Sequence, residues 1–531
     1  MKRFGAALIL VATVAILYRK AIRLWWMYDD AWLLHVALAR RWTMTFTDGD
    51  TWHRTFTPLL DSTYEVMIAL AGLEPGRWHA VSLMLVLLCA LSLFFALSLY
   101  LRVLPALAGA FLFVAGAPLC TFAMQFMLVH ILEAILLGTL ATATFILASR
   151  KASNALNFLS ATLFLLAMLA REIAMPLPAL LLVLPERNWR VRARHLVFHA
   201  AALVIYGVWR RTVLGTFFSG SGWAMTLSDV PAMLATLPWK VVTSWSGAAL
   251  EAGLPALVLI GIAAVFALRD PIAGRVALLG LAMAIAPLLT ASKEVGPRLT
   301  ITPWLWLCVV FAFGMSRMPR LPAAALALVT AGALLVANRQ QWSADFTQAE
   351  RMSDEARAFM RLDGASMLRA PAVPPAAMVE LQWLKEEHFR LARGSGWFYD
   401  DLYLCESGTE GRRVFEYHEA RREVLEVTAR IPDFARTYCS SIRETAPLRA
   451  EFRHVRDSLF WRFGPYANGR WRVVLGGGLQ AFDVPRDDGF SLPGVPGLSL
   501  RVRYQSPEGW VTYSPDITLD FATQPNFVWH R

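Results

Sequence analysis

The sequence predicts a polytopic α-helical membrane protein of about 11 transmembrane helices, followed by a C-terminal extracytoplasmic α+β domain that contains a β-sandwich or barrel-like part. Three observations support this fold class. The 531 residues are 56% hydrophobic with a mean hydropathy of +0.45, which is too apolar for a soluble protein. Apolar runs of about 20 residues recur along the first two thirds of the chain. After Ala337 the composition becomes that of an ordinary globular domain.

The predicted transmembrane helices follow the apolar runs in order. They lie at about 4–22, 79–101, 104–124, 129–148, 155–170, 173–185, 196–213, 245–267, 275–291, 301–316 and 321–337. The runs 155–170 and 173–185 are short, and Arg171-Glu172 separates them. They are either two short helices that meet at the membrane surface or one interrupted segment.

The charged residues predict an orientation. The net charge is +11, but the Lys and Arg residues fall mainly in short segments between apolar runs, which indicates membrane topology and contact with membrane lipids, not nucleic-acid binding. The positive-inside bias places the N-terminus in the cytoplasm, with residues 1–22 as an uncleaved signal anchor. An odd number of spans then places the C-terminal domain outside. The sequence therefore predicts a multi-pass protein of the cell (inner) membrane with a periplasmic domain.

The first outer segment, residues 23–78, contains two predicted helices. Helical spacing of apolar residues predicts an amphipathic interfacial helix over 30–42, and 57–71 is predicted to be a second helix. Between them, Thr47-Asp48-Gly49-Asp50 predicts a turn. Asp48 and Asp50 are also candidate ligands for a cation, although Asp-Gly-Asp usually forms only a turn.

The chain is predicted to form two domains, 1–340 in the membrane and 341–531 outside. Within the second, 341–447 is expected to be helical, with helices at 341–362 and 376–394, and 448–531 to be β-rich because short alternating runs are separated by Gly, Pro and Asp. Cys405 and Cys439 form a disulfide if this domain lies outside the cytoplasm, and are two unrelated thiols if it lies inside.

Two adjacent carboxylates, Asp29 and Asp30, follow the first apolar run within an aromatic stretch typical of a membrane surface. One hypothesis is that one of them is a catalytic base. The alternative is that they cap the helix that follows. Because adjacent residues on a helix point about 100° apart, only one of them can face a substrate squarely.

Other ionisable residues are predicted to lie at the same membrane face. They are His53, Arg54, Arg171, Glu172, Arg210, Arg211, Lys293, Glu294 and Arg298. Ionisable groups at that depth are unfavourable without partners or a function. Such residues also have ordinary interpretations. Arg210 and Arg211 can extend to lipid headgroups. His130 and Glu133, which are predicted at the same face, can hydrogen-bond between helices. Together they predict a binding site for an anionic substrate.

No soluble-enzyme motif is present, but four segments resemble the membrane-integral GT-C superfamily of glycosyltransferases, nearest its protein O-mannosyltransferase-like branch. They are Asp29-Asp30, the stretch from Phe56-Thr57-Pro58-Leu59 to Gly72-Leu73-Glu74-Pro75 and His79, Arg171-Glu172 with Pro176, and Lys293-Glu294 followed by Arg298 and Pro303. The resemblance covers residues 1–340. Thr57, Arg171 and Leu299 stand where the family's motifs carry arginine, lysine and tyrosine.

The resemblance implies an inverting transferase that moves a sugar from a polyprenyl-phosphate donor to a hydroxyl of a glycan, lipid or protein acceptor at the outer face. Such a reaction needs a base for the acceptor and cations for the leaving phosphate. The resemblance favours Asp29 as base, with Asp30 as its cap or orienting partner, and makes the cations candidates for the donor phosphate. No cofactor is required, although some relatives use a divalent metal.

Two other functions are compatible with the sequence. A transporter or flippase for a lipid-linked sugar would carry embedded ionisable residues and broken helices in matched halves, and no such half-repeat is visible. A non-catalytic membrane scaffold that presents the outer domain would retain full function after mutation of Asp29 and Asp30.

Overall fold

The computed structural model describes residues 2–39, 44–47, 56–186, 189–215, 230–248, 250–269, 271–285, 288, 296–389, 391, 396–409, 411–455, 458–491, 497–520 and 524–531. The chain divides into two compact units, with the boundary between Ala349 and Glu350. The predicted boundary between 340 and 341 is therefore about nine residues early. Each unit is described by itself below.

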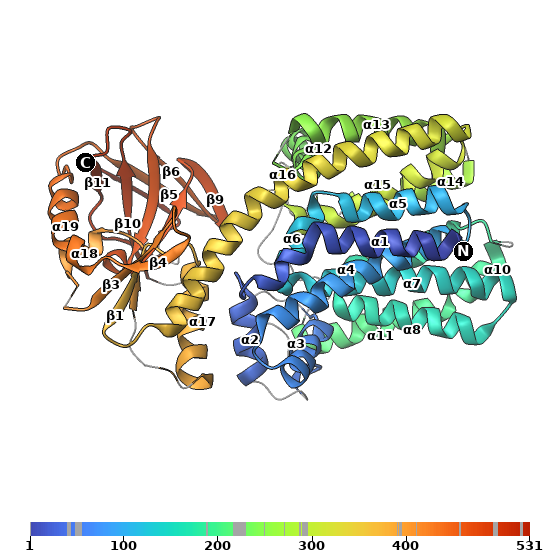
Figure 1. Cartoon of the computed structure of the whole chain (residues 1–531), viewed down its shortest axis with the longest axis horizontal. Coiled ribbons are helices and arrows are strands. Elements are labelled where there is room, and N and C mark those ends of the chain that lie inside the picture. The colour runs from blue at the N-terminus through green and yellow to red at the C-terminus, as the bar shows by residue number, and fades with distance from the viewer. Residues whose placement is uncertain are drawn as a thin grey trace. The chain divides into compact units, whose positions relative to one another are not determined.

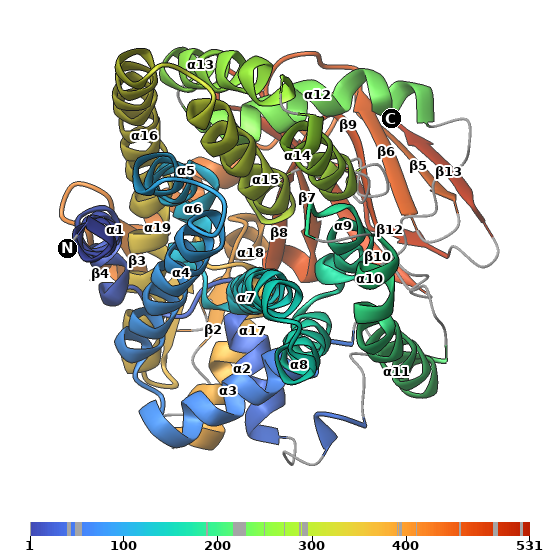
Figure 2. The ribbon, with the colours of Figure 1, turned by 90° about the vertical axis from the view of Figure 1, so that its right-hand side faces the viewer.

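The first unit is a bundle of helices (Figure 1, Figure 2). They are α1 (Lys2–Tyr18), η1 (Arg19–Arg23), α2 (Asp30–Ala39), α3 (Pro58–Ala71), α4 (Pro75–Leu97), α5 (Val103–Ala115), α6 (Pro118–Met124), η3 (Phe126–Leu128), α7 (Val129–Lys151), α8 (Asn154–Ala170), η4 (Glu172–Ala174), α9 (Leu177–Val183), α10 (Trp189–His195), α11 (Val197–Leu214), α12 (Val230–Ser246), α13 (Leu250–Leu268), α14 (Pro271–Ile285), α15 (Pro297–Ser316) and α16 (Arg320–Arg361).

Among the described residues, seven helices are long and apolar enough to cross a membrane, or eight if the bent pair α5 and α6 counts as one span. The sequence predicted about 11. Part of the difference comes from α8 and the η4–α9 segment, which the sequence counted as spans and which are apolar but shorter than 18 residues. A helix rises only about 1.5 Å per residue, so such segments are too short to cross a 30 Å hydrocarbon layer unless the bilayer thins locally or neighbouring segments help.

The apolar run 104–124 is not one straight span. Helices α5 and α6 are bent by 63° at the break around Gly116. Carbonyls at this break accept hydrogen bonds from side chains of other helices: Trp304 Nε1 donates to Phe113 (3.3 Å), and Asn338 Nδ2 donates to Gly116 (3.2 Å), which also accepts from the Leu119 N–H. Tyr18 Oη donates to the Val114 carbonyl at 2.7 Å. Irregular backbone inside a bundle is tolerated only when it is satisfied in this way.

The expectation of a separate helix at 341–362 is wrong, because this stretch is the C-terminal part of α16. Helix α16 is continuous over 42 residues and includes the last apolar run and the polar stretch after it. Its length of about 63 Å exceeds the thickness of a hydrocarbon layer. The change in composition at Ala337 therefore marks a change of environment along a helix and not the end of an element.

The second unit begins with a four-stranded sheet, which corrects the expectation that 341–447 is helical. The strands β1 (Ser366–Arg369), β2 (Gly396–Phe398), β3 (Arg413–His418) and β4 (Glu423–Glu426) are ordered β2-β1-β3-β4, with β1 parallel to β2 and β3. The helical elements are α17 (Pro375–Trp383), η7 (Leu384–His388), α18 (Leu402–Glu406), η8 (Thr428–Arg430) and α19 (Ile431–Ser440). The strands have three to six residues, too few for a clear alternation in the sequence.

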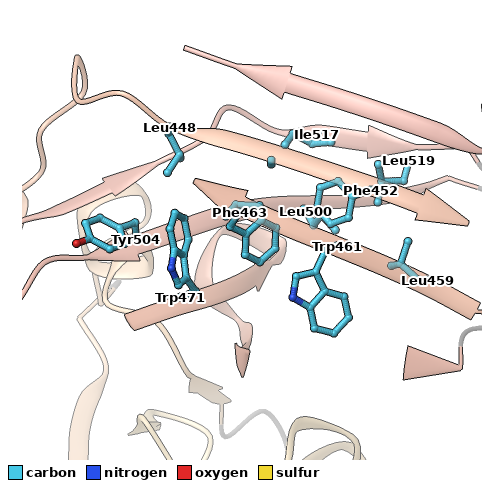
Figure 3. Packing of buried hydrophobic residues seen from close by; sticks show 12 residues of the cluster. Leu448, Phe452, Leu459, Trp461, Phe463, Trp471, Leu500, Tyr504, Ile517 and Leu519 are labelled. Atoms are coloured by element: carbon cyan, nitrogen blue, oxygen red, sulfur yellow. The ribbon is translucent and has the colours of Figure 1, made fainter. Parts of the chain in front are cut away.

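The remaining strands form two antiparallel sheets, as the alternating pattern after residue 448 predicted. One sheet has the order β11-β10-β7-β8 with β12 also paired to β10, and the other has the order β13-β5-β6-β9. The strands are β5 (Arg449–Val455), β6 (Ser458–Gly464), β7 (Arg470–Leu475), β8 (Gln480–Val484), β9 (Asp487–Ser491), β10 (Leu498–Gln505), β11 (Val511–Tyr513), β12 (Ile517–Leu519) and β13 (Asn526–His530). Residues from both sheets, including Phe452, Phe463 and Trp471, share one apolar core (Figure 3).

Two kinds of contact join the parts of the second unit. The buried Asp400 accepts hydrogen bonds from Tyr513 Oη (2.6 Å) and Arg503 Nη1 (2.9 Å), so it ties the first sheet's region to strands β10 and β11. A disulfide joins Cys405 of α18 to Cys439 of α19, across a sequence separation of 34 residues. The three other cysteines are free and buried.

Candidate active site

The two carboxylates of the acidic pair have opposite environments. Asp29 is exposed, whereas Asp30, the first residue of α2, has no exposed surface. Tyr28, which precedes them, has a positive φ of 50°. The turn before α2 therefore separates the pair, with Asp29 exposed and Asp30 enclosed.

Asp30 is held by three segments of the chain. Its Oδ2 accepts a hydrogen bond from the backbone N–H of Met27 (3.1 Å), and its Oδ1 accepts from Tyr64 Oη of α3 (2.8 Å). The backbone N–H of Met127 in η3 lies against the same carboxylate. Burial raises the pKa of Asp30 from 3.8 to about 7, against the effect of these donors.

The cap interpretation of the pair does not describe these contacts. The first turn of α2 is closed by the backbone carbonyl of Asp29, which accepts from the Leu33 N–H at 2.9 Å. Within the described structure, the Asp30 carboxylate reaches back to Met27 instead of taking an N–H of the turn that follows. Asp30 therefore positions the backbone around Asp29.

Tyr64, which the sequence did not single out, is fixed by aromatic neighbours. Its ring lies 5.1 Å from that of Trp78 and 5.2 Å from that of Phe126, both edge-on, and Trp78 also contacts Trp26. Trp26 is only 3% exposed, so the aromatic stretch expected at the membrane surface lies partly inside the bundle. An aromatic at position 64 looks like any core residue in the sequence, which is why no pattern indicated its role.

Met127 connects the acidic pair to the cations. On the side opposite Asp30, its carbonyl oxygen lies 2.8 Å from His130 Nδ1. The charge of Arg171 acts on His130, and the charge of Arg298 acts on Arg171. The structure thus brings Asp30, Arg171 and Arg298 to the same end of the bundle, although they are far apart in sequence.

A second group of contacts holds Arg210. Its guanidinium pairs with Glu172 and also donates to Tyr206 Oη (3.3 Å), which in turn donates to Glu172 Oε1 (3.2 Å). Arg171 acts electrostatically on Arg210. Arg210 is therefore a buried member of the cation cluster and does not extend to lipid headgroups. We define this cluster as Arg171, Arg210 and Arg298.

Arg211 is not part of the cluster. It is exposed and donates to the carbonyl of Gly215 at the end of its own helix. The two arginines are adjacent in sequence, but Arg210 is buried and Arg211 is exposed, so the structure groups only Arg210 with Arg171.

Glu133 has the structural role expected for it. It accepts a hydrogen bond from Thr63 Oγ1 at 2.6 Å and so joins α7 to α3.

Burial raises the pKa of the Tyr28 phenol, and the nearby carboxylate of Asp345 in α16 raises it further. The sequence gave no indication of this contact, because the two residues lie more than 300 positions apart.

Several predicted residues lie outside the described residues. They are His53, Arg54, Lys293 and Glu294, together with the candidate cation ligands Asp48 and Asp50. In the part of the chain that the structure describes, no three His, Cys, Asp or Glu side chains are placed to hold a metal ion.

The bundle of long apolar helices and the β-rich second unit define a multi-pass α-helical membrane protein with a C-terminal globular α+β domain. No family model matches the chain, and no curated protein matches it.

The solved structures that are similar to this chain include two crystal structures of ArnT from Cupriavidus metallidurans. The apo structure aligns at 15% sequence identity over 78% of this chain and 92% of that chain, with a TM-score of 0.46. The structure bound to undecaprenyl phosphate aligns at 15% identity over 78% of this chain and 94% of that chain, with a TM-score of 0.44.

Proposed function

We propose that the protein is an inverting glycosyltransferase of GT-C type, which moves a sugar from a polyprenyl-phosphate donor to an acceptor hydroxyl at the outer face of the membrane. The observation that carries the proposal is the link through Met127. This one residue contacts both Asp30 of the acidic pair and His130, which adjoins the cation cluster. A carboxylate and a set of guanidinium groups at one end of the bundle are what such a transfer requires.

Asp29 is proposed as the base. Its carboxylate is exposed, so an acceptor hydroxyl can reach it, whereas Asp30 is enclosed. Asp30 is proposed as a positioning residue, because its hydrogen bonds to Met27 and Tyr64 fix the turn that carries Asp29. A base held by a rigid turn loses less entropy when the acceptor hydroxyl approaches.

The cation cluster is proposed to bind the donor phosphate. Guanidinium groups match phosphate oxygens through paired N–H donors, and three of them lie close together here. Positive charge at this position stabilises the phosphate as the bond to the sugar breaks. Glu172 holds Arg210 in place through its ion pair.

The disulfide supports the proposed orientation. Disulfides persist in oxidising compartments such as the periplasm and are rare in the cytoplasm. The bond between Cys405 and Cys439 thus favours a periplasmic C-terminal domain, and α16 leads directly into that domain from the bundle. This agrees with an inner-membrane protein whose N-terminus is cytoplasmic.

The first test measures release of free polyprenyl phosphate from polyprenyl-phosphate–hexose donors in membranes that contain the protein. We expect Asp29→Asn to lower the rate about 10²–10⁴-fold, the usual contribution of a general base. Asp30→Asn should lower both the rate and the yield of folded protein, so expression is measured in parallel. Full activity in both variants would contradict the assignment of the acidic pair to catalysis, and the absence of donor-dependent release in the wild type would favour a non-catalytic scaffold.

The second test concerns the cation cluster. Arg171→Gln should raise the donor KM about tenfold or more, because a charge-assisted contact with phosphate is lost. Arg211→Gln is the matched control, since it removes the same charge from an exposed position nearby. Equal effects of the two substitutions would show that only the overall charge matters, and would argue against a built phosphate site.

A further inference from the structure

A large cavity lies inside the helix bundle, apart from the acidic pair. Its volume is about 970 Å³, and it lies between helices α4, α7, α14 and α15. Its walls are mainly apolar, with side chains such as Leu97, Ile146, Trp306 and Phe313. Ligand pockets in proteins usually measure about 300–1,000 Å³, so this cavity is at the upper end of the range for a bound molecule.

One end of the cavity is lined by three arginines. Arg102 follows the C-terminus of α4, Arg317 follows the C-terminus of α15, and Arg320 begins α16. All three are exposed and lie at or next to helix ends. We define these residues as the arginine rim.

The arginine rim and the cation cluster are at opposite ends of the bundle. Arg298 stands at the start of α15, whereas Arg317 follows its end. Their separation of 19 positions corresponds to about 28 Å along the helix. A phosphate on the rim is therefore a different phosphate from the one proposed at the cation cluster.

We propose that the cavity binds an anionic phospholipid from the membrane leaflet opposite the acidic pair. Its acyl chains would lie among the apolar side chains, and its headgroup phosphate would contact Arg102, Arg317 and Arg320. An apolar cavity between transmembrane helices with a basic rim has the charge and the surface that acidic headgroups with acyl chains require. The arginine side chains can also form paired hydrogen bonds to phosphate oxygens.

The headgroup contact is tested on the full-length protein in detergent, with cardiolipin as the probe and phosphatidylcholine of the same acyl chains as the neutral comparison. We expect cardiolipin to raise the melting temperature and phosphatidylcholine to have little effect. The triple variant Arg102→Gln, Arg317→Gln, Arg320→Gln should weaken the apparent affinity for cardiolipin about tenfold or more. The control variant Arg190→Gln, Arg194→Gln removes exposed charge from α10, whose residues do not line the cavity.

The acyl-chain contact is tested by filling the cavity. Gly138 of α7 lines it, and a side chain added there meets open space. Gly138→Leu should therefore fold normally and lose bound cardiolipin in native mass spectrometry. Gly261→Leu on α13 is the matched control, because that position also has open space and does not line the cavity.

Three results would overturn the proposal. The first is equal cardiolipin binding by the rim variant and the α10 control. The second is unchanged lipid retention in Gly138→Leu. The third is loss of undecaprenyl phosphate binding, but not of cardiolipin binding, in the rim variant, which would assign the cavity to the donor lipid. The sugar-transfer test above is separate, since neither Asp29 nor Arg171 is altered here.

Discussion

At the scale of single residues, the most informative feature is the different fate of neighbours in the sequence. Asp29 is exposed, whereas Asp30 is enclosed. Arg210 is buried and forms an ion pair with Glu172, whereas Arg211 is exposed. The sequence predicted that each pair lies at one membrane face but had no means to separate its members. About 100° of helix rotation decides which residue faces inward, and that rotation is set by packing against other helices.

The raised pKa of Asp30 predicts a dependence of stability on pH. A carboxyl whose pKa is about 7 in the folded protein and 3.8 otherwise keeps its proton to higher pH when folded. The folded state is therefore favoured at low pH, and this contribution is lost as the pH rises from about 4 to about 7, by at most about 1.4 kcal/mol per pH unit.

The prediction is measured as tryptophan-fluorescence melting in detergent between pH 4.5 and 8. The wild-type melting temperature should fall over this range, and Asp30→Asn should flatten the fall. Asp29→Asn, a substitution of the exposed neighbour, should retain it. A wild-type slope that persists in the Asp30 variant would assign the dependence to other groups.

At the scale of elements, the break between α5 and α6 shows how a polar backbone is kept inside an apolar bundle. Three carbonyls at the break each accept from a side chain of a different helix: Tyr18 of α1, Trp304 of α15 and Asn338 of α16. These donors come from distant parts of the sequence. The run 104–124 is apolar enough to be read as one span, although Gly116 and Pro118 within it are residues that favour a helix break.

Gly116 is predicted to tolerate no side chain. A Cβ added there would approach Trp304 Nε1 to 2.3 Å. Gly116→Ala should therefore lower the stability of the detergent-solubilised protein by about 1–3 kcal/mol, the usual effect of overpacking. Gly332→Ala on α16, where the added Cβ meets open space, should be neutral or stabilising because alanine favours helix. Thermal unfolding of both variants measures the difference, and equal melting temperatures would contradict the close contact.

At the scale of the whole molecule, the disulfide distinguishes the two units chemically. Cys405 and Cys439 of the second unit are bonded, and the three free cysteines, Cys89, Cys120 and Cys308, are buried in the bundle. In the chain-entropy model, a bond across 34 residues stabilises the folded state by about 3–4 kcal/mol.

Alkylation of the denatured full-length protein, isolated from membranes without reductant, is predicted to modify three of its five cysteines. After reduction all five should react, and the mass of the chain counts them. The variant Cys405→Ser, Cys439→Ser should show three reactive cysteines in both conditions and faster proteolysis after Glu350. Five reactive cysteines in the unreduced wild type would contradict both the bond and the periplasmic location of the domain.

The sequence by itself determined the class of the molecule. Long apolar runs must leave water as helices because their backbone groups need internal partners, and short alternating runs between turn residues form sheets. These local rules predicted the apolar bundle, the β-rich end and the helix at 57–71, and they indicated the acidic pair as a candidate site. For Cys405 and Cys439 they left two interpretations: a disulfide if the domain lies outside the cytoplasm, and two unrelated thiols if it lies inside.

Only the tertiary structure decided how these pieces combine. It enclosed Asp30 through Tyr64 and Met127, separated Arg211 from the cation cluster, joined the last span to the polar helix in α16, and placed a four-stranded sheet in a stretch expected to be helical. Each outcome depends on contacts between residues distant in sequence. The acidic pair was recognisable from its neighbours along the chain, but the difference between its two acids came from three other elements that pack around it.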